Sequence, residues 1–124
     1  MVLTAKDAIA RHMQWKITLI FAIQRREGLS AESVDQIAHE DHCAIGQWLL
    51  SKKTLGIRNR VEYKTLVARH KSFHCEMSRV AALINSGGFE EAEKALGPKS
   101  RYTAASHAIV FAIMEMDKVM QIRA

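Results

Sequence analysis

Residues 60–85, RVEYKTLVARHKSFHCEMSRVAALIN, form a long stretch without glycine or proline. Its apolar residues recur every three or four positions, which predicts a single helix with one broad inward stripe. The stripe consists of Tyr63, Leu66, Val67, His70, His74, Met77, Ala81 and Ile84. Two of its members are histidines four residues apart. A helix therefore places both imidazoles on one face, one turn apart, within reach of a single metal ion.

The flanking sequence predicts two more long helices. Thr4 followed by Asp7 resembles a capping box and Gly28 is a natural stop, so a helix is expected over residues 4–27. Its inward positions are expected to be Ile9, Met13, Ile17, Ile20 and Phe21. Near the other end of the chain, Ser100 is expected to open a helix that continues to the last residue, because no stop signal follows it.

The segments between these long helices predict shorter elements. Residues 29–38 read as a loop with a helical turn. Asp41 is a plausible N-cap for a helix that carries HCAIGQWLL to Ser51, and residues 52–59, KKTLGIRN, predict a connection. Residues 89–97 predict another short helix before the single proline.

These elements together predict an all-α fold, an antiparallel four-helix bundle of three long helices and one shorter inserted helix. The chain of 124 residues is long enough for one core, so a single domain over residues 1–124 is expected. One proline and six glycines are too few for a turn-rich β fold.

Composition argues against several classes of function. The net charge of +5 comes from basic residues scattered near helix ends, without interleaved aromatic residues, so nucleic-acid binding is not expected. No apolar run approaches the roughly 20 residues of a membrane span, and the N-terminus lacks the features of a signal peptide. The two cysteines are too few for a disulfide scaffold, which favours a reducing cytoplasm.

Two further residues complete a possible metal site with His70 and His74. His12 faces inward in RHMQW, and Cys43 begins CAIGQW. Gly46, one turn after Cys43, costs a helix roughly 1 kcal/mol, so close approach of a neighbouring helix to Cys43 is expected there. Three histidines and one cysteine would satisfy a tetrahedral zinc ion. Single core histidines are usually packing residues, so spacing alone leaves a metal site and an ordinary core equally open.

The short sequence motifs around these residues resemble those of a known protein family. His-x-x-Trp at His12, Cys-x-x-Gly-x-Trp at Cys43 and His-x-x-x-His at His70 occur in this order on successive helices. In this the chain resembles the chemoreceptor zinc-binding domain family of bacterial sensory modules. The resemblance covers nearly the whole chain, including the last helix, and its most specific part is the Cys-x-x-Gly-x-Trp motif.

The resemblance implies that zinc is bound by His12, Cys43, His70 and His74. It also implies a small α-helical bundle that forms a homodimer and regulates a chemoreceptor or a diguanylate cyclase. In the chemoreceptors of the family, the zinc-bound cysteine is a target for oxidants such as hypochlorous acid, which assigns a redox role to Cys43. No receptor coiled coil or cyclase domain accompanies these residues, so the output that the module controls stays open.

The chemistry of such a site fits sensing better than catalysis, and the protein is not expected to be an enzyme. Four protein ligands close the shell that catalytic zinc leaves open for water. Lys71 stands where a zinc protease has its glutamate. A zinc-bound thiolate is the form that oxidants attack, and its oxidation would release the shorter helix.

Neighbouring residues receive supporting roles. Trp15 and Trp48 are expected to pack around the site, and Asp41 to accept a hydrogen bond from a ligand histidine. Cys75 is expected to be a buried or spare thiol. The remaining histidines, His39, His42 and His107, are expected to be surface or packing residues.

Two other readings remain open. A haemerythrin-like diiron bundle also uses His-x-x-x-His, but it needs bridging carboxylates. Glu76 is badly phased for that role, and Ala112 stands where an acid would be needed after His107. A metal-free helical interaction module is the third possibility, in which the same histidines and cysteine only pack.

Overall fold

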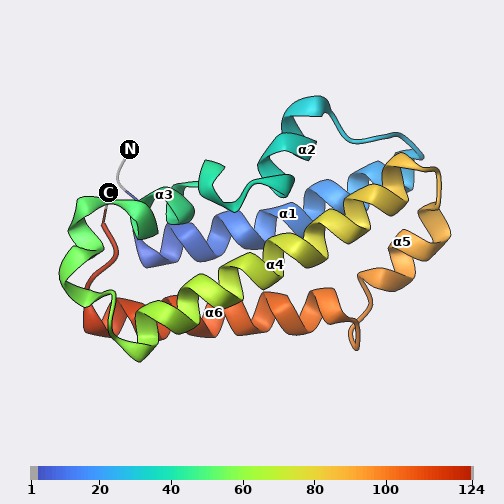
Figure 1. The fold of residues 1–124 in the computed structure, drawn as a ribbon. Helices are drawn as coiled ribbons and strands as arrows, with labels where there is room; N and C mark the ends of the chain where they lie inside the picture. Colours follow the sequence, from blue (N-terminus) through green and yellow to red (C-terminus); the bar gives the residue numbers. More distant parts are fainter. Residues whose placement is uncertain (1–2, 124) are drawn as a thin grey trace.

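A computed structural model of the chain describes residues 3–123, and every regular element within them is a helix. In chain order the elements are α1 (Ala5–Arg25), α2 (Ala31–Ala38), the 3₁₀ helix η1 (Glu40–His42), α3 (Ala44–Leu50), the 3₁₀ helix η2 (Lys52–Ile57), α4 (Val61–Asn85), α5 (Phe89–Ala95) and α6 (Arg101–Val119). The long helices α1, α4 and α6 lie side by side, and α2, η1 and α3 follow one another along the fourth position (Figure 1). The chain reverses direction from each rod to the next, which confirms the predicted antiparallel four-helix bundle. No helix in residues 3–123 is long and apolar enough to cross a membrane.

Local capping signals place several helix ends where the sequence predicts them. The Thr4 hydroxyl accepts from the Asp7 amide at 3.1 Å, and the Asp7 side chain accepts from the Thr4 amide, which is the predicted capping box. Ser100 caps α6 through the Thr103 amide. The central helix α4 begins and ends within one residue of its predicted bounds.

Several predictions about where helices begin and end differ from the structure. Helix α1 ends at Arg25, because Arg26 adopts the left-handed conformation with φ 53° and stops the helix before Gly28 is reached. The predicted loop over residues 29–38 contains a full helix, α2, which Ser30 caps. Helix α6 ends at Val119 rather than at the end of the chain, since the Asp117 side chain accepts from the Ile122 amide and turns that residue into the core.

The shorter helix also begins later than predicted. Asp41 lies inside η1, and the N-cap of α3 is Cys43. The fourth rod is therefore broken into three pieces, α2, η1 and α3, because His39 and Cys43 both have extended backbone. This break positions Cys43 at a corner of the chain rather than on the side of a helix.

The buried face of α1 differs from the predicted one. Ala8, His12, Leu19, Ala22 and Ile23 are buried, whereas the predicted inward residues Met13, Ile17 and Phe21 are about half exposed. The helix carries apolar residues on two faces, about 160° apart at 100° per residue, and its packing against α4 and α6 buries the face that contains His12.

The stripe predicted for α4 is largely correct. All its predicted members are buried except Val67, which is 39% exposed. Phe73, which the prediction omitted, is fully buried between His12, His74 and Tyr102. Helix α4 is therefore the central rod of the core, and its histidine pair faces α1.

Candidate metal centre

The structure brings together the four residues that the sequence singled out as ligands. They are His12 from α1, Cys43 from the corner before α3, and His70 and His74 from α4. One ligand atom from each lies within 4.8 Å of the other three, and the three imidazoles are at most 4% exposed. We call these four residues the tetrad.

The distances from the cysteine sulfur suit a common ion. The Cys43 Sγ lies 3.1 Å from the His70 Nε2 and 3.8 Å from the His74 Nε2. A tetrahedral zinc ion with ordinary Zn–S and Zn–N bonds separates a sulfur from a nitrogen ligand by about 3.6 Å. The observed distances lie on either side of this value, so small side-chain adjustments suffice.

Backbone carbonyl groups orient two of the imidazoles. The His12 Nδ1 lies 2.7 Å from the carbonyl oxygen of Ala8, and the His74 Nδ1 lies 3.0 Å from that of Ile37. In each pair the Nδ1–H donates, which leaves the Nε2 lone pair free for a ligand. The carbonyl groups take the orienting role that the sequence assigned to the Asp41 carboxylate.

The His12 Nε2 has no hydrogen-bond partner among residues 3–123, although it is fully buried. An unpartnered buried nitrogen is costly, and most buried polar atoms in proteins are satisfied. Because this atom faces the other tetrad members, a bound metal ion would supply its missing partner. The tetrad therefore fits a zinc ion both in its donor types and in its geometry.

Burial keeps the imidazoles neutral. Desolvation lowers the pKa of His12 to about 4 and, together with the nearby His12 and His74 rings, lowers the pKa of His70 to about 2. The pKa of His74 is lowered by the same burial. Neutral imidazole is the form that binds metal, so the site is prepared for a cation near neutral pH.

The thiol of Cys43 behaves in the opposite way. Burial raises the pKa of this thiol, and the amides of Gly46 and Ile45 at the start of α3 offset the rise only in part. Without metal the sulfur is therefore a thiol, which donates to the Glu40 carbonyl oxygen at 3.3 Å. Metal binding at neutral pH would release this proton.

Gly46 is needed for the corner that positions the sulfur. A Cβ atom at Gly46 would lie 2.0 Å from the carbonyl oxygen of Glu40, far inside van der Waals contact. The predicted close approach at Gly46 therefore exists, but its partner is the preceding turn η1 rather than a neighbouring helix.

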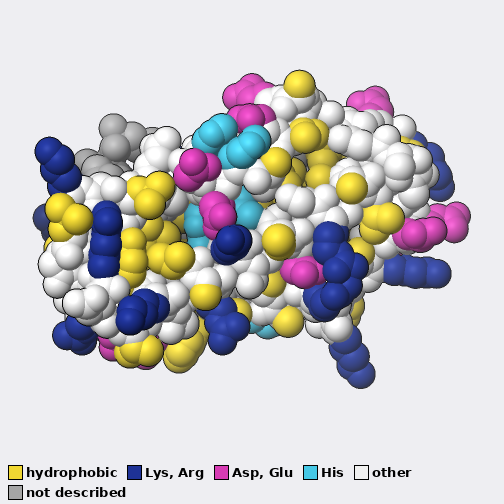
Figure 2. All heavy atoms as spheres, viewed as in Figure 1, with side chains coloured by type: hydrophobic (Ala, Val, Ile, Leu, Met, Phe, Trp, Pro, Cys, Tyr) yellow, Lys and Arg dark blue, Asp and Glu magenta, His cyan; other side chains and the backbone are white. Residues whose placement is uncertain are grey.

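Aromatic residues surround the tetrad unequally. Phe73 packs edge-on against the His12 ring at 5.4 Å. Trp15 is half-buried and lines, with His12 and Cys43, a cleft of about 460 Å³ that reaches the site. Trp48, on α3, is 2% exposed and belongs to the hydrophobic core. Figure 2 shows histidine side chains within a hollow of the molecule and at its rim, beside acidic side chains.

The remaining predicted residues lie at the surface. Asp41 is exposed and shares a cleft wall with His70, but no hydrogen bond joins the two within residues 3–123. Cys75 is an exposed thiol. Of the two predicted alternatives, a buried thiol and a spare thiol, the buried one is therefore wrong. His39, His42 and His107 are exposed, in line with the surface role expected for them.

Sequence reasoning missed three contributors to the site. The carbonyl groups of Ala8 and Ile37 have no side-chain signature, although helical geometry alone places the Ala8 carbonyl one turn before His12. Phe73 lies between the two ligand histidines of α4 in sequence and carried the signal of an apolar residue in a helix.

Comparison with known proteins identifies a protein family whose model matches part of the chain. The family model described as the chemoreceptor zinc-binding domain matches residues 12–81, a range that contains the whole tetrad. No curated protein and no solved structure matches the chain.

Proposed function

The chain belongs to the chemoreceptor zinc-binding domain family, and from this premise we propose that it is a regulatory module in which the tetrad binds one zinc ion. The observation that supports this most directly is the buried Nε2 of His12, which lacks a hydrogen-bond partner among residues 3–123 in a group whose ligand atoms lie within 4.8 Å of one another. The four protein ligands leave no position for a reacting water, so the module regulates and does not catalyse.

A bound zinc ion would hold Cys43 as thiolate. Because its ligands come from α1, the corner before α3, and α4, the ion would connect these three parts of the chain. The helices α1 and α4 are long and packed along the core, whereas the corner is a short irregular stretch between η1 and α3. Zinc occupancy therefore decides chiefly how firmly η1 and the start of α3 are fixed. A segment with two such states is a suitable signalling element.

Oxidation of Cys43 provides a second input to the same corner. The sulfur is partly exposed and lines the cleft of about 460 Å³, so a small oxidant such as hypochlorous acid can reach it. The sulfur attacks chlorine, and hydrolysis of the S–Cl bond gives sulfenic acid and chloride, a two-electron oxidation of sulfur. Sulfenic acid is a poorer ligand than thiolate, so both zinc loss and oxidation free the corner. The outputs we propose are those of a chemoreceptor or a diguanylate cyclase in the cytoplasm, where thiols stay reduced.

The exposed apolar stripe of α1 suggests how the module pairs. Met13, Ile17 and Phe21 lie on α1, which packs on α6, and Phe111 and Met114 of α6 are at least half exposed. A groove of about 450 Å³ runs between the two helices. Contiguous exposed apolar residues mark interaction surfaces, and a second copy of the chain presents the complementary ridge. We therefore propose a homodimer through α1 and α6.

Metal analysis tests the zinc site. Protein purified without added metal is expected to hold one zinc per chain, and Cys43→Ser to lose affinity by more than about 100-fold, since even orienting partners of metal ligands contribute 10–100-fold. Cys75→Ser, the matched loss of an exposed thiol, is expected to keep it. Equal zinc retention in the two variants would contradict the tetrad. A coloured iron-containing protein would instead support the haemerythrin-like alternative, and metal-free protein the interaction module.

Sedimentation equilibrium tests the dimer. Phe111→Glu is expected to raise the dimer dissociation constant at least about tenfold, because it places a charge in the apolar seam. Leu55→Glu changes an equally exposed leucine of η2 and is expected to leave the dimer intact. A parent protein that stays monomeric at high concentration, or equal effects of both variants, would rule out this interface.

A further inference from the structure

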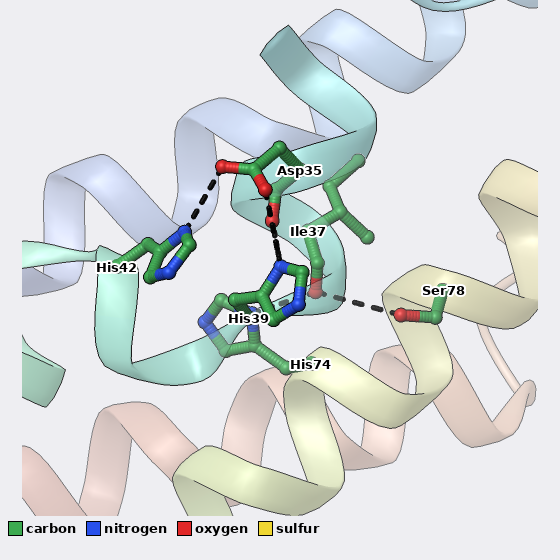
Figure 3. A network of polar contacts seen from close by, with 6 residues as sticks. All are labelled: Asp35, Ile37, His39, His42, His74 and Ser78. Atoms are coloured by element: carbon green, nitrogen blue, oxygen red, sulfur yellow. Dashed lines mark hydrogen bonds and ion pairs between the residues drawn. The ribbon is translucent and has the colours of Figure 1, made fainter. Parts of the chain in front are cut away.

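A second group of metal-binding side chains lies on the surface, outside the tetrad. Asp35 of α2 contacts two histidines: its Oδ2 lies 2.9 Å from the His42 Nδ1 and its Oδ1 lies 3.2 Å from the His39 Nδ1. The two imidazole rings stack with centroids 4.6 Å apart, and one ligand atom from each of the three residues lies within 4.8 Å of the others. Figure 3 shows Asp35 joined to both rings. We call these three residues the surface triad.

The chemistry of the surface triad suits zinc and similar divalent ions. Two imidazoles and one carboxylate favour zinc, copper or nickel over calcium or magnesium, which prefer all-oxygen sites. Ligands of a tetrahedral zinc ion with N and O donors stand about 3.3 Å apart, close to the two measured contacts. The hydrogen bond from His42 also holds the pKa of the Asp35 carboxyl below its usual range, so the carboxylate is ionised and ready to bind.

The surface triad differs from the tetrad in coordination and in exposure. It supplies three ligands and leaves a fourth position for water, and all three side chains are exposed. Its zinc would therefore be held more weakly and exchange faster than zinc in the tetrad.

The position of the surface triad connects it with the tetrad. His42 precedes Cys43 in the chain and lines the same cleft as Cys43 and His12. The carbonyl oxygen of Ile37, between Asp35 and His39 in sequence, accepts hydrogen bonds from His74 and from Ser78 on α4 (Figure 3). An ion at the surface triad would thus stand at the rim of the cleft that leads to the tetrad.

We propose that Asp35, His39 and His42 form a second, weaker zinc site, from which zinc passes through the cleft to the tetrad. The binding at the surface triad stands by itself, whereas the delivery rests on the proposed function of the tetrad. During transfer the four tetrad side chains replace the three triad ligands and the bound water, which leaves to solvent with the proton of the Cys43 thiol.

Titration with cobalt(II) and zinc separates the two sites in the full chain. The parent protein is expected to bind two ions per chain, the first with the near-ultraviolet charge-transfer band of a cobalt–thiolate bond and the second without it. The double variant His39→Gln/His42→Gln is expected to bind one ion and to keep the band. Asp35→Asn, which preserves shape, is expected to weaken only the second ion, and His107→Gln, the loss of an exposed histidine on α6, to change neither. A parent that binds a single ion with the thiolate band, or a double variant that still binds two ions, would overturn the surface site.

The rate of zinc uptake tests delivery. At zinc concentrations below that of protein, the double variant is expected to fill the tetrad about tenfold more slowly than the parent, because a charged cleft rim raises the local ion concentration. Its equilibrium affinity at the tetrad should be unchanged. Equal uptake rates would overturn the delivery role. Failure of the proposed function itself looks different, since the parent would then bind one ion without the thiolate band, and Cys43→Ser would leave that ion unchanged.

Discussion

The helix α4 and the broken fourth rod supply ligands to the same site by different physical means. Helix α4 is uninterrupted from Val61 to Asn85, and its pitch alone brings the His70 and His74 rings to 4.6 Å. Cys43 instead has extended backbone at the corner between η1 and α3 and depends on the missing side chain of Gly46. One pair of ligands is therefore preformed, whereas the sulfur is placed by the least regular part of the chain. Under the proposed function, the corner is therefore the element that we expect zinc to control.

The largest expected effect is in hydrogen exchange after zinc removal. Without zinc, the amides of residues 43–46 are expected to exchange roughly 100-fold faster, because they lose the ligand bond that fixes the corner and local opening then costs little. The amides of residues 70–77 on α4 should change by less than about threefold, since their helix is held by core packing. Hydrogen–deuterium exchange read by mass spectrometry, with and without a chelator, measures both segments in one experiment. Uniform acceleration along α4 and the corner would show that zinc holds the whole bundle and not the corner.

Local signals explain what could be predicted of the fold and the site. Thr4 and Ser100 cap helices through their own side chains, and His70 and His74 meet because of helical pitch, so short-range sequence suffices for these features. The Cys-x-x-Gly-x-Trp motif likewise identifies Cys43 as a ligand, although it does not predict the shape of the corner around this residue.

The errors arise where contacts that leave no repeating pattern in the sequence decide the structure. Met13 and His12 lie on alternative apolar stripes of α1, and only the packing of other helices selects the stripe with the histidine. The contact between the Gly46 and Glu40 backbones depends on a chain reversal that has no periodic pattern. The Ile37 carbonyl orients His74 across 37 positions of sequence, and a carbonyl group is common to every residue.

The second prediction concerns a substitution that changes the corner alone. Gly46→Ala is expected to destabilise the protein by about 1–2 kcal/mol, because overpacking against the Glu40 carbonyl exceeds the gain of about 1 kcal/mol in helix propensity. Zinc affinity should fall about tenfold, as the displaced η1 moves the sulfur. Urea denaturation and zinc competition measure the two effects.

Gly56→Ala is the matched control for this change. A Cβ atom at Gly56 meets nothing within 4 Å, so this variant should be neutral or slightly more stable and keep its zinc affinity. If Gly46→Ala kept both properties as well, the corner would be more plastic than the contact with Glu40 implies.

The smallest expected effect compares the two regions in zinc-free protein as pH falls. The folded protein holds the pKa of His70 at about 2 and that of His12 at about 4, below the ordinary value of 6.5. Below pH 6.5 the unfolded chain therefore binds more protons, and stability that is fully present above this pH is lost progressively on acidification. Each of these histidines should contribute a loss of roughly 1 kcal/mol between pH 7.5 and 5.5.

The variants His70→Gln and Cys43→Ser assign this acid sensitivity to one region. His70→Gln should reduce the pH-dependent loss by the share of one histidine. Cys43→Ser should leave the acid dependence unchanged, because burial raises the pKa of the thiol and it stays protonated throughout this range. Urea denaturation at several pH values, with a strong chelator present, measures the slopes. An equal change in slope for both variants would mean that the acid sensitivity does not belong to the histidines of α4 alone, and the contrast between a preformed histidine pair and a cysteine placed by the corner would fail.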